Sequence, residues 1–421
     1  MTSQSTTQND HHTVPPQIPL ASLQRITFVA PFGLGQKTTV WARILPLAQY
    51  LHRQGLEVEI LIPPWDTPAH SGLIWSDGGV RIENVRLAGG PPAIFGRMVR
   101  RLQRRPAQIV HIVKPVAYAG GIQTLLWHLG KALGIHPRIV LDIDDWEQDW
   151  ARLNGRSGPV QRLISWQENW GHTHAHGITA ASQWLVDQVQ RRNPALPICY
   201  LPNGLAQTPS TSPTRAAADD APVHYPTPES AQILFFSRFM EISPAWLADF
   251  CTTIFDHHPT ATLQVAGAGI HPQLETDFKT AFQSHAAQSE LDISRIQWLG
   301  HIRLDDLGPL YESSVCAIFP AQPTPLQQAK CSVRLATTLL HGVPVIASAV
   351  GEQRAYGQAG NIQLLAPDAT PQAFAQAVLE LLQDPDTQRT RQRAAHASLL
   401  AQYNWSALGA RLYEFYGTLL G

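Results

Sequence analysis

The feature that most constrains the fold is an alternation of short apolar segments with longer amphipathic ones along most of the chain. Apolar segments such as ITFVA at 26–30 and AQIVHIV at 107–113 have the length and β-branched content of buried strands. Segments such as TVWARILPLAQYLHRQG at 39–55 space their apolar residues as a helix does and end in glycine. Strands that alternate with helices predict an α/β fold with mostly parallel, doubly wound sheets.

The alternation is interrupted once, which predicts two domains in this chain of 421 residues. Residues 206–230 are rich in Pro, Ser, Thr and Ala, and the apolar segment QILFFSR at 232–238 restarts the pattern. We expect two Rossmann-like domains that face each other across a cleft, which is where such domain pairs bind ligands. The expected divisions are a disordered tail at 1–22, a first Rossmann-like domain at 23–205, a linker at 206–230, a second Rossmann-like domain at 231–402, and a helix at 403–421 that packs back on the first domain.

Charge and composition exclude several classes of protein. The formal net charge is -1, so the chain lacks the basic field that attracts nucleic acid. No apolar run approaches the ~20 residues that span a bilayer, and the polar first twenty residues do not resemble a signal peptide, so we expect a cytoplasmic protein. The cysteines form no C-x-x-C pair, which argues against a zinc or redox motif.

The segment PFGLGQKTT at 31–39 is similar to a phosphate-binding P-loop but departs from its pattern. Gln36 separates Gly35 from Lys37, and no glycine stands five residues before Gly35. A glycine-rich turn between a strand and a helix still presents backbone N–H groups to an anion. The segment therefore has three interpretations: a P-loop of an ATP-dependent kinase, a loop that approaches another phosphate or a sugar, and an ordinary tight turn.

A series of motifs in a fixed order resembles the GT-B glycosyltransferases, and specifically the GT4-like family called glycosyl transferases group 1. The motifs are PFGLGQKTT, HGITAASQWLVDQV, YLPNG before the linker, ILFFSRF after it, LYESSVCAIFP and HGVPVIAS near the end. The resemblance implies transfer of a sugar from a nucleotide-diphosphate sugar to an acceptor hydroxyl, with the acceptor bound by the domain at 23–205 and the nucleotide-sugar by the domain at 231–402. It also implies a retaining, metal-independent reaction with the nucleotide-sugar as co-substrate and no further cofactor.

The resemblance also implies which residues bind the donor. Arg238 matches the family's diphosphate-binding arginine, and an arginine fork suits a phosphate. The family's lysine six residues later is replaced by Pro244. Lys330 and Arg334 are four residues apart, and we expect them on one helical face, where they replace the missing charge. The further expected donor contacts are Gly33, Gly35, Lys37, Ser237, Thr337, Gly351 and Glu352.

The family's Glu-x7-Glu motif is absent from the chain. Its two glutamates fall on Ala329 and Thr337. A neutral hydroxyl at Thr337 in place of a charged acceptor weakens donor binding by about tenfold. The missing carboxylates and the missing lysine leave an alternative open, in which the chain is a catalytically impaired GT-B protein that acts as a binding or partner subunit.

Acidic residues gather at the end of the predicted strand RIVLDIDD, in LDIDDWEQDW at 141–150, which contains Asp142, Asp144, Asp145 and Glu147. Because ligands bind at the carboxyl ends of parallel strands, we expect Asp144 or Asp145 to contact the acceptor, with one as general base. A divalent cation is an alternative ligand for these carboxylates. The structural alternative is that one of the aspartates caps the N-terminus of the helix that follows. The histidines of GHTHAHG at 171–177 lack nearby cysteine or carboxylate partners, so we expect no metal there.

A basic segment, GRMVRRLQRR at 96–105, is the one candidate for contact with a membrane surface. Its arginines at 97, 100, 101, 104 and 105 are interleaved with apolar residues, as in helices that lie on anionic membranes. The chain is then expected at the inner face of the membrane, holding a lipid acceptor. An ordinary solvent-exposed helix face has the same pattern.

Overall fold

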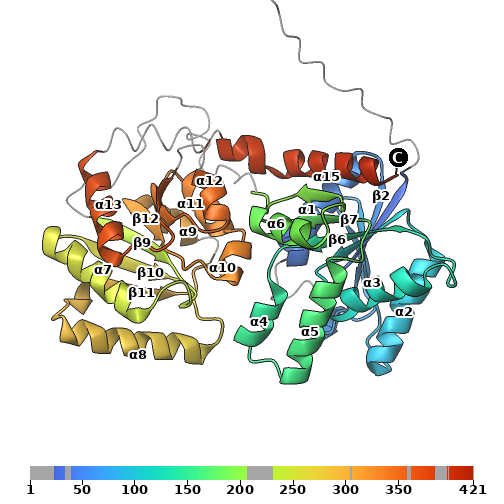
Figure 1. The fold of residues 1–421 in the computed structure, drawn as a ribbon, viewed down its shortest axis with the longest axis horizontal. Coiled ribbons are helices and arrows are strands. Elements are labelled where there is room, and N and C mark those ends of the chain that lie inside the picture. The colour runs from blue at the N-terminus through green and yellow to red at the C-terminus, as the bar shows by residue number, and fades with distance from the viewer. Residues whose placement is uncertain are drawn as a thin grey trace, which may run out of the picture.

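The computed structural model describes residues 23–33, 39–205, 231–303, 306–357, 362–384, 396 and 398–420. These residues form two α/β domains side by side, each with a central sheet between helices (Figure 1). The predicted fold class is therefore confirmed: the chain has two Rossmann-like, doubly wound domains.

The first domain is built on an eight-stranded sheet in the order β3-β4-β2-β1-β5-β6-β7-β8. All neighbouring strands are parallel except β3, which pairs antiparallel with β4. The order reverses beside β1, which pairs with β2 on one side and β5 on the other, and ligands bind at such a reversal. The strands are β1 (Arg25–Val29), β2 (Glu57–Ile62), β3 (Ile74–Asp77), β4 (Val80–Asn84), β5 (Ile109–Val113), β6 (Arg138–Ile143), β7 (Gly177–Ala180) and β8 (Ile198–Tyr200).

Helices cover both faces of this sheet. The segment predicted as one helix over 39–55 is divided into a π-helical turn at Val40–Ile44 and α1 at Leu45–Arg53. Pro46 lies in the first turn of α1, where its missing N–H costs no hydrogen bond. The remaining helices are α2 (Gly90–Arg104), α3 (Ala117–Leu129), α4 (Glu147–Leu153), α5 (Gly158–Gly171) and α6 (Gln183–Arg192).

The second domain has a six-stranded, fully parallel sheet in the order β11-β10-β9-β12-β13-β14. Its order reverses beside β9, so β9 is the counterpart of β1. The strands are β9 (Gln232–Phe236), β10 (Thr262–Ala266), β11 (Ile296–Gly300), β12 (Cys316–Phe319), β13 (Val345–Ser348) and β14 (Gln363–Leu365). The helices are α7 (Pro244–His257), α8 (Pro272–Gln288), α9 (Leu307–Ser313), α10 (Pro325–Ala329), α11 (Val333–Leu340), α12 (Glu352–Gly357) and α13 (Pro371–Gln383).

The last helix, α15 (Trp405–Leu420), returns to the first domain and lies along α1 (Figure 1). Its buried residues Leu408, Leu412 and Tyr416 belong to the same apolar core as β1 and β2. Gly409 permits the close approach, because a Cβ there would lie 2.3 Å from the Tyr50 ring. The core of the first domain is thus completed by the last residues of the chain.

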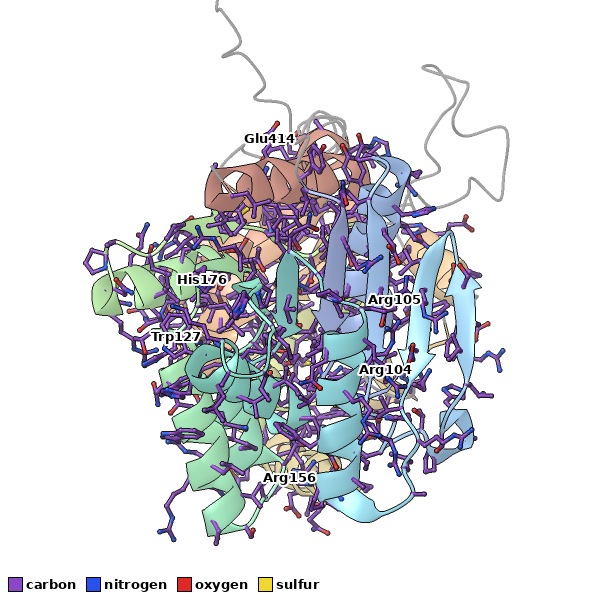
Figure 2. All side chains as sticks on the ribbon, turned by 90° about the vertical axis from the view of Figure 1, so that its right-hand side faces the viewer. Arg104, Arg105, Trp127, Arg156, His176 and Glu414 are labelled. Carbon is purple, nitrogen blue, oxygen red and sulfur yellow. The ribbon has the colours of Figure 1, made fainter. Side chains whose placement is uncertain are left out.

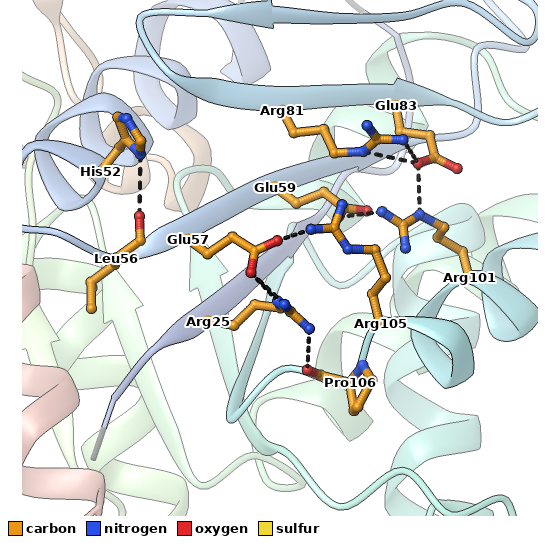
Figure 3. A network of polar contacts seen from close by, with 10 residues as sticks. All are labelled: Arg25, His52, Leu56, Glu57, Glu59, Arg81, Glu83, Arg101, Arg105 and Pro106. Carbon is orange, nitrogen blue, oxygen red and sulfur yellow. Dashed lines mark hydrogen bonds and ion pairs between the residues drawn. The ribbon is translucent and has the colours of Figure 1, made fainter. Parts of the chain in front are cut away.

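The basic segment at 96–105 lies in α2, and most of its arginines face the first domain rather than solvent (Figure 3). Arg101 donates to Glu83 and Glu59 at 2.6 Å each, and Arg105 forms an ion pair with Glu57. Burial raises the pKa of Glu59 to about 7, against the attraction of Arg101. This network joins β1, β2, β4 and α2 through ion pairs among Arg25, Glu57, Glu59, Arg81, Glu83, Arg101 and Arg105.

The network changes the interpretation of α2 as a membrane-binding helix. Arg97 donates to the carbonyl groups of Arg86 and Ala88, so it too is held by the protein. Arg100 and Arg104 remain as the exposed arginines of α2. The helix therefore offers two cations to an anionic surface where its sequence suggests five. None of the helices in the described ranges is both long and apolar enough to cross a bilayer.

Candidate active site

The carboxyl ends of β5 and β6 bring together a buried lysine and three carboxylates. Lys114 follows β5 and has a positive φ of 61°, a strained conformation for a residue with a side chain. Its Nζ lies 2.7 Å from Asp144 Oδ1, 3.2 Å from Asp145 Oδ2 and 2.6 Å from Glu147 Oε1. The Lys114 side chain is 6% exposed, so its charge is neutralised by these carboxylates rather than by water.

This arrangement bears on the question of a divalent cation. Within the described ranges, Asp144, Asp145 and Glu147 are the one group of acidic, histidine or cysteine residues spaced to hold a metal ion. The ammonium of Lys114 lies within ion-pair distance of all three and supplies a positive charge to them. Burial raises the pKa of Asp144 to about 6 against the attraction of Lys114, and the nearby Asp145 charge adds to the rise. Burial lowers the pKa of Lys114, but the three carboxylates together raise it well above its usual value.

Asp142 belongs to a different, structural network. Arg43 donates from Nε and Nη2 to the two oxygens of Asp142 at 2.9 and 2.7 Å, and both side chains are buried. Arg43 also donates to the carbonyl groups of Leu201 and Pro202 at 2.8 and 3.2 Å. Thr179 donates to the same carboxylate at 2.6 Å. Arg43 therefore fixes the YLPNG turn against the end of β6, and Asp142 is fully buried with both oxygens bound within the protein.

The first loop is described in part. Gly35 and Lys37 lie outside the described residues, so their predicted donor contacts stay predictions. Gly33 donates its N–H to Asp66 at 2.6 Å, and a Cβ there would lie 2.0 Å from Thr67 Oγ1. Gly33 is therefore explained by the close approach of the loop at 66–67, and its predicted donor contact stays a prediction. Thr39 ends the loop and donates to Asp144 Oδ2 at 3.2 Å.

In the second domain, backbone N–H groups of the loop after β9 bind the carboxylate of Glu241, a residue of the same loop. Glu241 Oε2 accepts from the N–H groups of Arg238 and Met240 at 3.0 and 3.2 Å and from the Ser237 hydroxyl at 3.1 Å. Phe239 has a positive φ of 61° and donates its N–H to Ser237 Oγ. Successive N–H groups that converge on one anion form a typical binding position for a negative charge. Ser237 shapes this loop from a buried position.

The predicted cations Arg238, Lys330 and Arg334 all lie at this loop, although not in the expected way. Lys330 ends α10 and precedes the start of α11 at Val333, so the prediction of one shared helical face is wrong. Lys330 Nζ is 3.8 Å from Glu241 Oε1. The Arg334 guanidinium lies 5.0 Å from the centre of the Phe236 ring. Burial lowers the pKa of Arg334, and the charge of the neighbouring Arg238 lowers it further.

The two arginines differ from Lys330 in their exposure. Arg238 and Arg334 are exposed and form no ion pair with any described residue, whereas Lys330 is half-buried and pairs with Glu241. Three cations at the carboxyl end of β9, two of them without a protein counter-charge in the described ranges, can bind an anionic group of a ligand.

The remaining predicted donor contacts lie around the same strand ends. Thr337 is half-buried on α11, one turn after Arg334. Gly351 has a φ of 52°, and a Cβ there would lie 2.6 Å from the Gln328 carbonyl oxygen, so glycine is required by the approach of α10. Glu352 is buried, and it accepts from the Gln183 N–H at 2.7 Å and from the Tyr200 hydroxyl. Its expected donor contact does not fit this arrangement, because both of its oxygens bind the first domain.

The site has two halves, the Lys114 cluster of the first domain and the β9 loop with its cations in the second, and these lie against each other. Met240, Leu326 and Ala329 of the second domain pack in the same apolar cluster as Ile143 and Trp146 of the first. Helix α10 contacts α4 and α6 of the first domain, so the two domains meet beside the Lys114 cluster, whose Glu147 begins α4. The structure thus brings Arg238, Lys330 and Arg334 to one side of a domain contact, and Asp144 and Asp145 to the other.

Three residues of the site were not identified from the sequence. Lys114 directly follows the buried strand of HIVKP, a position that could have indicated it. Arg43 interrupts the apolar face of a helix, which indicates a buried ion pair. Glu241 lies three residues after Arg238, and its backbone contacts depend on a loop conformation that no sequence pattern predicts.

Two Rossmann-like domains packed against each other are the architecture of the GT-B class of glycosyltransferase. Comparison with family profiles identifies the glycosyl transferase 4-like domain at residues 38–204 and glycosyl transferases group 1 at residues 230–384. The chain therefore belongs to the glycosyl transferases group 1 family. A search of curated proteins gives no match.

Solved structures share the fold over nearly the whole chain. The sucrose-phosphate synthase from Thermosynechococcus elongatus is 16% identical, with a TM-score of 0.66, over 94% of this chain and 99% of that one. The HepE protein of Anabaena in complex with UDP-glucose is 13% identical, with a TM-score of 0.60, over 94% and 99%. The trehalose 6-phosphate synthase from Burkholderia multivorans is 13% identical, with a TM-score of 0.62, over 94% and 97%.

Proposed function

We propose that the protein transfers a sugar from a nucleotide-diphosphate sugar to an acceptor hydroxyl. The observation that carries the proposal is the convergence of Arg238, Lys330 and Arg334 at the carboxyl end of β9. Negative charge develops on the leaving nucleotide diphosphate as the sugar departs, and fixed cations that face it lower the barrier. The position of β9 at the reversal of its sheet supports the same site.

Each domain has its own role in this proposal. Arg238 holds the diphosphate as a fork, while Lys330 and Arg334 add charge in place of the family's lysine, replaced here by Pro244. Asp144 or Asp145 contacts the acceptor hydroxyl, with Asp145 the more exposed of the two, and Lys114 sets the position of both carboxylates. We take the reaction as retaining and metal-independent from family membership. The positive charge of Lys114 among the carboxylates supports the absence of a metal requirement.

We propose a uridine diphosphate sugar as the first donor to examine, since the HepE structure holds UDP-glucose. The test is thermal unfolding of the wild type and Arg238→Ala with UDP, UDP-glucose, GDP-mannose and ADP-glucose. A ligand at about a hundred times its dissociation constant stabilises the folded state by ~2.7 kcal/mol. We expect one nucleotide series to stabilise the wild type, and Arg238→Ala to lose that stabilisation.

The matched control is Arg138→Ala, because Arg138 is an exposed arginine at the opposite end of the first sheet. Loss of stabilisation in both variants, or in neither, contradicts the assignment of Arg238. Transfer of the sugar in the presence of EDTA, with the product's anomeric configuration followed by NMR, then tests the reaction type. Donor binding without hydrolysis or transfer to any acceptor would favour the impaired GT-B protein that acts as a binding subunit.

A further inference from the structure

Helix α5 carries an apolar surface that the proposed reaction does not use. Val160, Leu163 and Trp166 are 41%, 50% and 49% exposed and lie on one side of the helix. Trp127 and Leu129, at the end of α3, are 38% and 52% exposed. Large apolar side chains scattered singly are normal on a surface, whereas a contiguous group indicates a binding surface.

Ring contacts join the two helices into one surface. Along α5, Trp166 stacks on Trp170 with ring centres 6.1 Å apart, and Trp170 stacks on His174 at 4.2 Å with an angle of 8°. His174 in turn meets the edge of Trp127 at 5.4 Å. We call this set, from Val160 and Leu163 through Trp166 and Trp170 to Trp127, the α5 surface. The α5 surface lies on the side of the first domain away from α15. Figure 2 shows Arg156, beside this surface, at one edge of the domain and Glu414 of α15 at the opposite edge.

The charges around the α5 surface have one sign. Arg156 and Arg162 are exposed beside it on the α4–α5 turn and on α5, and Lys131 is exposed four residues after Trp127. Glu168 is the single acidic residue of α5, and it is fully buried. Its carboxylate accepts from the N–H groups of Glu147 and Gln148. The surface is therefore apolar and basic, with no exposed carboxylate on the helix that forms it.

We propose that the α5 surface docks the protein on an anionic lipid bilayer. Exposed aliphatic and tryptophan side chains next to arginines suit the boundary between acyl chains and headgroups. A second copy of the chain is a poorer partner, because two basic surfaces would then face each other. A glycan is also a poorer partner, because Trp166, Trp170 and His174 use their ring faces for stacking on one another.

The α5 surface is not the membrane-binding segment that the sequence predicts. Residues 96–105 of α2 are the basic amphipathic segment by pattern, but Arg97, Arg101 and Arg105 are held within the protein. The α5 surface keeps its arginines at solvent and adds exposed apolar side chains.

The test is co-sedimentation of the full chain with vesicles. One set contains equal parts of phosphatidylcholine and phosphatidylglycerol, and the other contains phosphatidylcholine alone. We expect the wild type to prefer the anionic vesicles and to dissociate from them at high salt. Leu163→Asp and Trp166→Asp should each lower partitioning by about tenfold, since each removes an exposed apolar side chain that the bilayer would bury and adds a repelled charge.

The matched control is Ile293→Asp, an equally exposed apolar residue in the second domain. Thermal unfolding and size exclusion verify that each variant is folded. Equal binding by Leu163→Asp and Ile293→Asp, or no binding by the wild type to either vesicle, overturns the proposal. A loss confined to Arg100→Gln with Arg104→Gln overturns it in favour of α2, and a change of oligomeric state in Leu163→Asp overturns it in favour of a protein interface.

Discussion

The two halves of the candidate site use charge in opposite ways. In the first domain, Lys114 and Arg43 are buried and each is paired with carboxylates at hydrogen-bond distance. In the second domain, Arg238 is exposed, and the Lys330 ion pair is long at 3.8 Å. A buried, paired charge fixes the positions of its neighbours, whereas a weakly paired cation remains available to a ligand. The comparison therefore assigns the cations of the first half to positioning their neighbours and the cations of the second half to binding the ligand.

The sharpest way to break this comparison is to remove a cation from each half and measure stability. Arg43→Met leaves Asp142 as a buried carboxylate without its ion partner, so we expect the free energy of unfolding to fall by about 3–5 kcal/mol. Arg238→Met removes an exposed side chain and should change it by less than about 0.5 kcal/mol. Urea denaturation of both variants measures the difference. Equal effects would show that the two halves are not distinct.

The next largest effect concerns donor binding by the second half. Lys330→Ala and Arg334→Ala each remove one charge near the β9 loop, and hydrogen bonds to charged groups contribute about 1.5–3 kcal/mol. We therefore expect each variant to raise the donor KM or to lower kcat by about tenfold or more, with stability nearly unchanged. Steady-state kinetics with the donor identified by thermal shift make the measurement. Wild-type kinetics in both variants would remove these residues from the site.

The first half should show a pH dependence that the second lacks. The pKa of Asp144 is raised to about 6, so the folded state binds its proton more strongly than the unfolded state does. The stability due to Asp144 is then fully present below about pH 4 and lost as pH rises toward 6, by up to about 1.4 kcal/mol per pH unit. Asp144→Asn lacks this loss. The free energy of unfolding of the variant should therefore rise relative to that of the wild type across this range.

Other groups titrate in both proteins and cancel in that difference. Burial lowers the pKa of His111 to about 4 and that of His172 to about 3, and their contributions run in the opposite direction. Denaturant unfolding of wild type and Asp144→Asn at several pH values gives the comparison. Parallel curves would show that Asp144 is ionised throughout the range.

The smallest expected effect comes from restoring, in the second half of the site, a glutamate that the family carries and this chain lacks. Thr337→Glu restores a charged acceptor on α11, and a gain of up to about tenfold in donor affinity is expected. Thr337→Gln is the control, because it has similar size without the charge. Isothermal titration with the donor nucleotide measures both variants. Weaker binding by the glutamate than by the glutamine would indicate that α11 does not face the donor ribose.

The sequence predicted the architecture well, because the alternation of strands and helices follows local periodicity. It missed the β3–β4 hairpin, although Asp77 and Gly78 carry a turn signal between short apolar runs. It gave no bounds for α5, whose buried residues are Gln167, Glu168 and Gly171 while Val160, Leu163 and Trp166 are exposed, so that no apolar stripe marks its buried side.

The site was predicted less completely than the fold, and the reason is physical. The sequence identified Asp144, Asp145, Lys330 and Arg334 by position relative to strands and motifs. It did not separate Asp142 from its neighbours, because burial beside Arg43 depends on a contact 99 residues away in the chain. Nor did it reveal that Glu352 joins the domains, since its partners Gln183 and Tyr200 lie in the other domain.

The return of α15 to the first domain has a consequence for how the protein is made. Leu408, Leu412 and Tyr416 fill the core around β1 and β2, yet these strands leave the ribosome before any part of the second domain is synthesised. The first domain must wait with an open apolar surface along α1 until residues 405–420 emerge. Its final packing therefore follows translation of the second domain, and a chain released early would expose that surface to chaperones and to aggregation.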